Sequence, residues 1–172
     1  MPNERVLVVD DELSMREFLS ILLKRDEYEV DTASSGEEAL EKAKKDWPDL
    51  VLSDLNMPGM TGIDLLRALK NEGSKRRTDV SVVLVTAFGT TESAVEAMHL
   101  GAADYVTKPF NNDELRLVVR RVLGRRRLEE ENLRLRVALK ERYHFGNLVG
   151  SSQAMVVVYD LIGRVKDSRI NV

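Results

Sequence analysis

Acidic, hydroxyl and amine side chains follow four short apolar runs in this 172-residue sequence. They are Asp10, Asp11, Asp54, Thr86 and Lys108. Three carboxylates held close together repel one another unless a cation lies between them, and ligands that are all oxygen atoms suit Mg2+. A carboxylate can also attack phosphorus, while a metal and a lysine ammonium neutralise the oxygens of the phosphoryl group in transfer. These residue types therefore point to Mg2+-dependent phosphoryl chemistry.

Strands must bring these side chains together, because the apolar runs lack polar alternation and are typical of strands buried on both faces. Amphipathic stretches separate the runs, and Ser14 and either Ser34 or Ser35 are the expected caps of the first two helices. The predicted strands lie near 6–9, 28–33, 50–52, 80–85 and 105–106, and the predicted helices at 15–23, 35–43, 63–69, 91–100 and from 113 on. Five βα units imply an α/β, flavodoxin-like, doubly wound parallel sheet, whose ligands bind beyond the carboxyl ends of the strands.

Each of these signals is weak when taken alone. An Asp-Asp pair after a strand is often only a helix cap or a turn, a single threonine such as Thr86 is usually structural, and Lys108 is more often a solvated charge. Their joint occurrence at four strand ends, in the right order, is much harder to obtain by chance. The combination therefore favours one shared site over separate structural roles.

Four segments resemble the receiver domains of bacterial two-component response regulators: VLVVDDE, DLVLSDLNMPGMTGIDLL, VVLVTAFG and GAADYVTKPF. The resemblance covers residues 4–123. It implies that Asp54 is the phosphoacceptor, and that Asp10 and Asp11 form the acidic pair of a Mg2+ site, with Asp11 as the direct ligand. Asn56 would add its backbone carbonyl to the metal, and Pro58-Gly59 matches the turn that follows in the family.

The same resemblance implies a switch beside the phosphorylated residue. Thr86 would supply the switch hydroxyl, the Ala87 N–H would also face the phosphoryl group, and Lys108 would pair with it. Tyr105 would move inward when Thr86 is drawn to the phosphoryl group. The Lys108–Pro109 bond matches the family's usual cis peptide, a form accessible mainly to proline.

The last predicted helix continues past the expected end of the domain, to about Arg142, with Gly124 as its single breaker. One heptad register gives a seam for a parallel two-stranded coiled coil, in which an Asn at an a position fixes the register. The seam residues are Leu128, Asn132, Leu135 and Leu139. A single solvated helix with i,i+4 salt bridges is the alternative, and other registers stay open.

The segment FGNLVGSSQAM near the C-terminus is similar to the start of the AAA+ ATPase domain in NtrC-type activators of sigma-54 RNA polymerase. No G-x-x-x-x-G-K motif occurs, so ATP hydrolysis is not expected of this chain. The expected organisation is a receiver domain at 1–123, an extended helix and coiled-coil linker at 113–142, and the beginning of an ATPase domain at 143–172.

Charge is unevenly distributed along the chain. The formal net charge of −3 divides into −8 for residues 1–110, +4 for 111–145 and +1 for 146–172. The basic cluster, which includes Arg120, Arg121 and Arg125–Arg127, lacks interleaved aromatic residues and a helix-turn-helix signal. It is therefore interpreted as a solvated or pairing helix face, with no direct DNA binding.

The absence of cysteine excludes disulfide scaffolds and thiolate sites, and no apolar run is long enough to span a membrane. No signal peptide is recognisable at the N-terminus, so a cytoplasmic location is expected. A dinucleotide-binding domain is disfavoured because the first βα turn, DDELSM, has no glycine fingerprint.

The expected function is a signalling switch that accepts a phosphoryl group from a sensor histidine kinase. It would catalyse only its own Mg2+-assisted phosphorylation and dephosphorylation, and would pass the change through a homodimeric linker to a sigma-54-dependent transcription activator. The face formed by residues 91–106 is a second expected dimer contact. The alternative is a phosphotransferase or phosphatase with a diffusible substrate, but Asn56 stands where such enzymes need an acid, and no insertion could form a cap.

Overall fold

The computed structural model describes residues 4–76, 79–87 and 91–142. Strands and helices alternate strictly along this part of the chain, as the sequence predicts. Their bounds are β1 Arg5–Val9, α1 Leu13–Arg25, β2 Glu29–Ala33, α2 Gly36–Lys45, β3 Leu50–Asp54, α3 Gly62–Arg76, β4 Ser81–Thr86, α4 Thr91–His99, β5 Asp104–Thr107 and α5 Asn112–Arg142.

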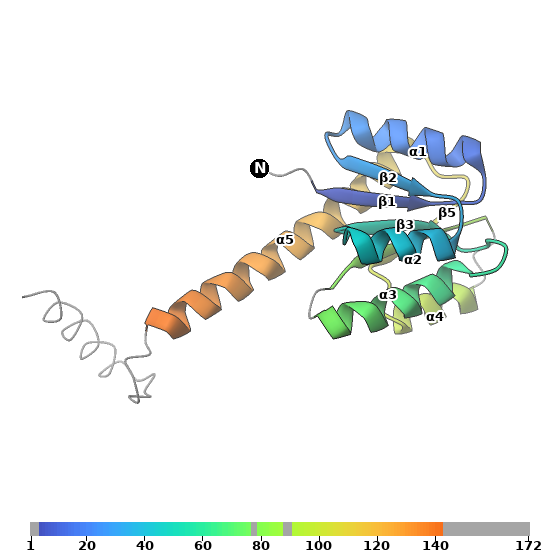
Figure 1. Cartoon of the computed structure of the whole chain (residues 1–172). Coiled ribbons are helices and arrows are strands. Elements are labelled where there is room, and N and C mark those ends of the chain that lie inside the picture. The colour runs from blue at the N-terminus through green and yellow to red at the C-terminus, as the bar shows by residue number, and fades with distance from the viewer. Residues whose placement is uncertain (1–3, 77–78, 88–90, 143–172) are drawn as a thin grey trace, which may run out of the picture. The chain divides into compact units, whose positions relative to one another are not determined.

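The strands form one five-stranded parallel sheet in the order β2-β1-β3-β4-β5, and all their carboxyl ends lie at one edge (Figure 1). The chain first winds outward from β1 to β2, then returns across β1 to β3 and continues outward. The winding direction therefore reverses between β1 and β3, where a sheet of this kind opens a crevice for ligands. The predicted flavodoxin-like, doubly wound fold is confirmed.

Alternate residues of the strands feed two hydrophobic cores, one on each face of the sheet. Val6 and Val8 of β1 pack with buried residues of α1 and α5, while Leu7 and Val9 pack with those of α2, α3 and α4. Figure 1 shows these two sets of helices on opposite faces. Because both faces are covered, the central strands need apolar residues at every position, which explains the unbroken apolar runs.

Two helix starts test the predicted caps. Ser35 is the N-cap of α2, and its hydroxyl accepts the backbone N–H of Glu38 at 3.2 Å. The expectation for Ser14 is wrong: α1 begins at Leu13, and its N-cap is Glu12, whose side chain makes no capping hydrogen bond. The helix starts earlier because the turn after β1 is already closed by Asp10, whose carboxylate accepts the Glu12 N–H at 2.9 Å.

The chain divides into two compact units, Met1–Arg126 and Arg127–Val172. The α5 helix begins in the first unit and ends in the second, and Gly124 does not interrupt it. The pairing of its second half in a coiled coil stays a prediction, and the expected ATPase segment at 143–172 lies outside the described residues. Within the described part, no helix has the length and apolar character needed to cross a membrane.

Candidate functional site

Each predicted site residue on the sheet stands at or just past a strand end. Asp54 and Thr86 are the last residues of β3 and β4, while Asp10 and Lys108 directly follow β1 and β5. Since these four strands are parallel and contiguous in the sheet, their ends share one edge. The backbone N–H of Lys108 donates to the carbonyl of Thr86 at 2.7 Å, which ties the ends of β4 and β5 together.

Lys108 joins two carboxylates that are distant in the sequence. Its Nζ lies 2.6 Å from Asp54 Oδ1 and 3.0 Å from Asp10 Oδ2. The side chains of Asp54 and Asp10 are only 8% and 3% exposed, so both charges are largely removed from water. Two buried carboxylates thus share one ammonium, and the pair of acids remains short of positive charge.

The pKa of Lys108 reflects this position. Burial of the ammonium lowers its pKa, but hydrogen bonds and charges from Asp54 and Asp10 outweigh that effect, and the net pKa is raised from its ordinary value of 10.5. The lysine therefore stays protonated at neutral pH and remains a fixed positive charge at the site.

The second oxygen of each carboxylate accepts a backbone N–H two residues further on. The Asn56 N–H donates to Asp54 Oδ2 at 2.8 Å, and the Glu12 N–H donates to Asp10 Oδ1 at 2.9 Å. Arg16 adds a guanidinium hydrogen bond to the carbonyl of Asp10 at 2.7 Å. The roles of Glu12 and Arg16 could not be predicted from the sequence, because a backbone donor and a contact from the next helix have no sequence motif.

The remaining predicted residues lie around this pair. Thr86 is buried at 4% exposure, whereas Asp11, Asn56 and Ala87 are exposed at the surface of the same edge. In the described residues no group of three acidic, histidine or cysteine side chains is close enough to form a complete metal cage. The structure thus brings together Asp10, Asp54 and Lys108, and it leaves Asp11 beside them in contact with solvent.

The donor set fits a hard divalent cation. Carboxylates and a backbone carbonyl are oxygen ligands, and Mg2+ usually takes one or two carboxylates and keeps several waters, so a full protein cage is not required. Asp10 and Asp54 share a single ammonium, so a net negative charge remains to attract a cation. Asp11 is exposed to solvent, so an ion bound here can keep water ligands. These residues are therefore compatible with a magnesium ion.

The predicted switch aromatic, Tyr105, lies at the protein surface on β5. It is 42% exposed and borders a surface cavity of about 430 Å³, together with residues of α4. The α4 residues lining the cavity are Ala94, Val95, Met98 and His99. The peptide bond between Lys108 and Pro109 is cis, as expected.

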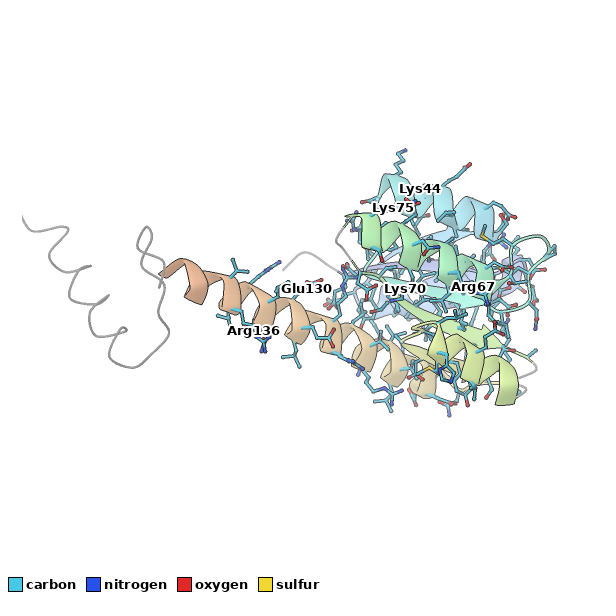
Figure 2. The ribbon with its side chains drawn as sticks, turned by 90° about the horizontal axis from the view of Figure 1, so that it is seen from below. Lys44, Arg67, Lys70, Lys75, Glu130 and Arg136 are labelled. Carbon is cyan, nitrogen blue, oxygen red and sulfur yellow. The ribbon has the colours of Figure 1, made fainter. Side chains whose placement is uncertain are left out.

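The predicted linker seam lies in the second unit. Leu128 and Leu135 are 66% and 59% exposed, and Asn132 is also exposed. Leu139 belongs to the same helix, but its side chain lies outside the described residues. Figure 2 shows charged side chains on this helix as well, among them Glu130 and Arg136.

Comparison with known proteins agrees with this geometry. The family model described as the response regulator receiver domain matches residues 6–120. Regulatory protein AtoC of Escherichia coli is 38% identical over 88% of the chain, and the C4-dicarboxylate transport transcriptional regulatory protein DctD of Pseudomonas aeruginosa is 39% identical over 92%. The chain spans about a third of both relatives, 32% of AtoC and 34% of DctD.

Solved structures show the same relationship. NtrX from Brucella abortus is 33% identical, with a TM-score of 0.71 over 96% of this chain and 35% of NtrX. The chemotaxis protein CheY4 of Vibrio cholerae is 37% identical, with a TM-score of 0.65 over 70% of this chain and 98% of CheY4. AtoC, DctD and NtrX support the NtrC-type resemblance, because their similarity extends over most of the chain. The chain belongs to the response regulator receiver domain family.

Proposed function

We propose that the chain is a phosphorylation-operated switch in which Asp54 accepts a phosphoryl group from a sensor histidine kinase. The observation that carries the proposal is the buried carboxylate of Asp54, which is held by Lys108 through one oxygen and by the Asn56 N–H through the other. Receiver domains are signalling domains of two-component systems rather than ordinary enzymes. Response regulators typically act in the cytoplasm, and the same location is proposed for this chain.

The transfer step is a displacement at phosphorus. An oxygen of Asp54 attacks the phosphorus atom and the P–N bond of the donor phosphohistidine breaks. The imidazole leaves with the electron pair and takes up a proton. Lys108, the Thr86 hydroxyl and the Ala87 N–H then face the phosphoryl oxygens and stabilise their charge. Hydrolysis of the acyl phosphate by water returns the Asp54 carboxylate and releases inorganic phosphate.

Receiver domains generally bind Mg2+ for phosphorylation, and the ion would supply positive charge that stabilises the phosphoryl group in transfer. The carboxylates of Asp10, Asp11 and Asp54 and the backbone carbonyl of Asn56 are the groups that would hold it. A backbone N–H group already orients each of the Asp10 and Asp54 carboxylates.

The output proposed for the switch follows the NtrC type. Phosphorylation draws Thr86 toward the phosphoryl group, Tyr105 moves inward, and the surface formed by α4 and β5 changes. The linker, residues 113–142, pairs with a second copy and restrains an AAA+ ATPase domain whose first residues are 143–172. Contact with sigma-54 RNA polymerase belongs to that domain. The matches to AtoC, DctD and NtrX extend over most of this chain, beyond the receiver domain, and this supports the arrangement.

Incubation with acetyl phosphate and Mg2+ tests the phosphoacceptor. Mass spectrometry of the whole chain is expected to show one added phosphoryl group, which is lost in Asp54→Ala and in the presence of a chelator. Asp113→Asn, at an aspartate that is 97% exposed in the first turn of α5, is the matched control and should be phosphorylated normally. Equal phosphorylation of Asp54→Ala would contradict the assignment, and turnover of a phosphoester well beyond one equivalent per chain would favour the enzyme alternative.

A further inference from the structure

The loop between β3 and α3, residues 55–61, is held at both of its ends by hydrogen bonds from backbone N–H groups. At its start, the Asn56 N–H donates to the Asp54 carboxylate, and at its end the Gly62 N–H donates to the Leu55 carbonyl at 2.9 Å. A Cβ at Gly62 would lie 2.4 Å from the carbonyl oxygen of Asp54, so the backbone of α3 packs directly against the strand end. The middle of the loop lies between these two fixed ends.

The middle of the loop is held by the first turn of α2. The Met60 N–H donates to Glu37 Oε1 at 3.1 Å, across 23 positions of sequence. A Cβ at Gly36 would lie 2.7 Å from the Met60 side chain, so the loop lies directly against the helix. Gly59, with φ of 77°, makes the turn that presents the Met60 N–H to the carboxylate.

This contact lies outside the constellation of the proposed site, yet it acts on the same loop. Glu37 is exposed, and it belongs to the first turn of α2, the helix that follows the carboxyl end of β2. Asn56, whose carbonyl is a proposed metal ligand, belongs to that loop. A shift of the loop would move this carbonyl relative to the carboxylates of Asp10 and Asp54.

We propose that Glu37 is a positioning residue that holds the β3–α3 loop, and with it the Asn56 carbonyl, in place for the divalent cation. The inference rests on the proposed phosphoacceptor function. Mg2+ demands near-ideal octahedral geometry, and groups that orient its ligands commonly affect affinity strongly. Glu37 should therefore influence metal affinity, and should have little effect on phosphoryl transfer once the metal is saturating.

Three variants of the full chain separate the hydrogen bond from other effects. Glu37→Ala removes the acceptor and the charge, Glu37→Gln removes only the charge and keeps an oxygen acceptor, and Glu41→Ala removes an exposed carboxylate one turn further along α2. Calorimetric titration measures the Mg2+ dissociation constant, and NMR measures the exchange rate and chemical shift of the Met60 amide proton.

Glu37→Ala is expected to raise the Mg2+ dissociation constant by about threefold to tenfold and to expose the Met60 amide, because one hydrogen bond to a charged group is lost. Glu37→Gln and Glu41→Ala should stay within about twofold of the wild type. The rate of phosphorylation by acetyl phosphate at saturating Mg2+ should be the same in all variants.

Equal weakening of Mg2+ binding by Glu37→Ala and Glu37→Gln would assign the effect to charge and overturn the proposal. An unchanged dissociation constant or an unchanged Met60 amide in Glu37→Ala would overturn it too. Failure of the proposed function has a different signature, since the wild type itself would then not accept a phosphoryl group on Asp54, whereas the Met60 amide reports on the loop directly.

Discussion

Asp10 and Asp54 distribute their oxygens in the same way, one to Lys108 and one to a backbone N–H. All four oxygens are therefore satisfied, although the site holds two negative charges and one positive charge. Satisfied hydrogen bonds allow buried charges to persist, while an uncompensated charge attracts a cation. The hydrogen bonds thus stabilise the arrangement, and its remaining negative charge favours binding of Mg2+.

Lys108→Met should destabilise the fold at pH 7 by about 2 kcal/mol, because two buried carboxylates lose their shared ammonium. In the wild type the pKa of Lys108 is raised above 10.5, so its stabilising contribution is present below that pH and is lost as the pH rises through the raised value. Urea unfolding of the wild type and the variant, from pH 7 to alkaline pH, measures both the loss at neutral pH and its disappearance as Lys108 is deprotonated.

Lys75→Met is the matched control for that prediction. Lys75 also pairs with a carboxylate, Glu72 at 2.7 Å, but its side chain is 70% exposed and lies on the outer surface of α3 (Figure 2). Exposed ion pairs of this kind contribute little to stability, so loss of the Lys75 ammonium should cost less than about 1 kcal/mol. Equal destabilisation by the two substitutions would show that the shared ammonium has no special role.

At the scale of elements, replacing each of two helix glycines with alanine should change the free energy of unfolding in opposite directions. Gly62→Ala places a methyl group 2.4 Å from the Asp54 carbonyl, whereas a Cβ at Gly124 in α5 meets nothing within 4 Å. We expect Gly62→Ala to lower the free energy of unfolding by about 1–3 kcal/mol, and Gly124→Ala to raise it by about 0.5–1 kcal/mol. Thermal and urea unfolding measure these changes, and changes of the same sign would contradict the packing described for Gly62.

The basic segment of α5 makes contacts that a local sequence pattern does not predict. The sequence predicts a solvated or pairing face for Arg120, Arg121 and Arg125–Arg127, but several arginines of α5 form ion pairs with acids of other elements within Met1–Arg126. The pairs are Arg116 with Asp26 at 3.1 Å, Arg121 with Asp104, and Arg126 with Asp49 at 3.1 Å. These ion pairs join residues up to about 90 positions apart in the sequence, so no local pattern predicts them.

Strand positions and the polar residues at their ends could be predicted because complete burial leaves an unbroken apolar signature. The location of Asp54 and Thr86 follows directly from that signature. The division of the Asp54 oxygens between Lys108 and Asn56 could not be predicted, since it depends on the path of the following loop. The predicted cap at Ser14 is wrong for a similar reason. The start of α1 depends on the turn before it, which the Asp10 carboxylate closes.

At the scale of the whole molecule, the acidic and basic parts of the sequence have separate explanations. Part of the negative charge of residues 1–110 belongs to Asp10 and Asp54 in the site, and other acids pair with α5. The basic segment is therefore partly neutralised within Met1–Arg126. In the second unit, exposed apolar residues are the feature that still needs a partner, and they lie on two opposite sides of the helix.

Leu128 and Leu135 lie on the proposed seam, while Leu133 and Val137, which are 63% and 48% exposed, lie on the opposite side. If the seam pairs two chains, Leu128→Ser with Leu135→Ser should convert a dimer into a monomer at micromolar concentration, because both d positions lose their packing. Leu133→Ser with Val137→Ser removes a similar apolar surface and should remain dimeric. Sedimentation equilibrium distinguishes the two, and phosphorylation of Asp54 should be retained in both. A monomeric wild type, or dissociation by the second pair alone, would rule out this seam.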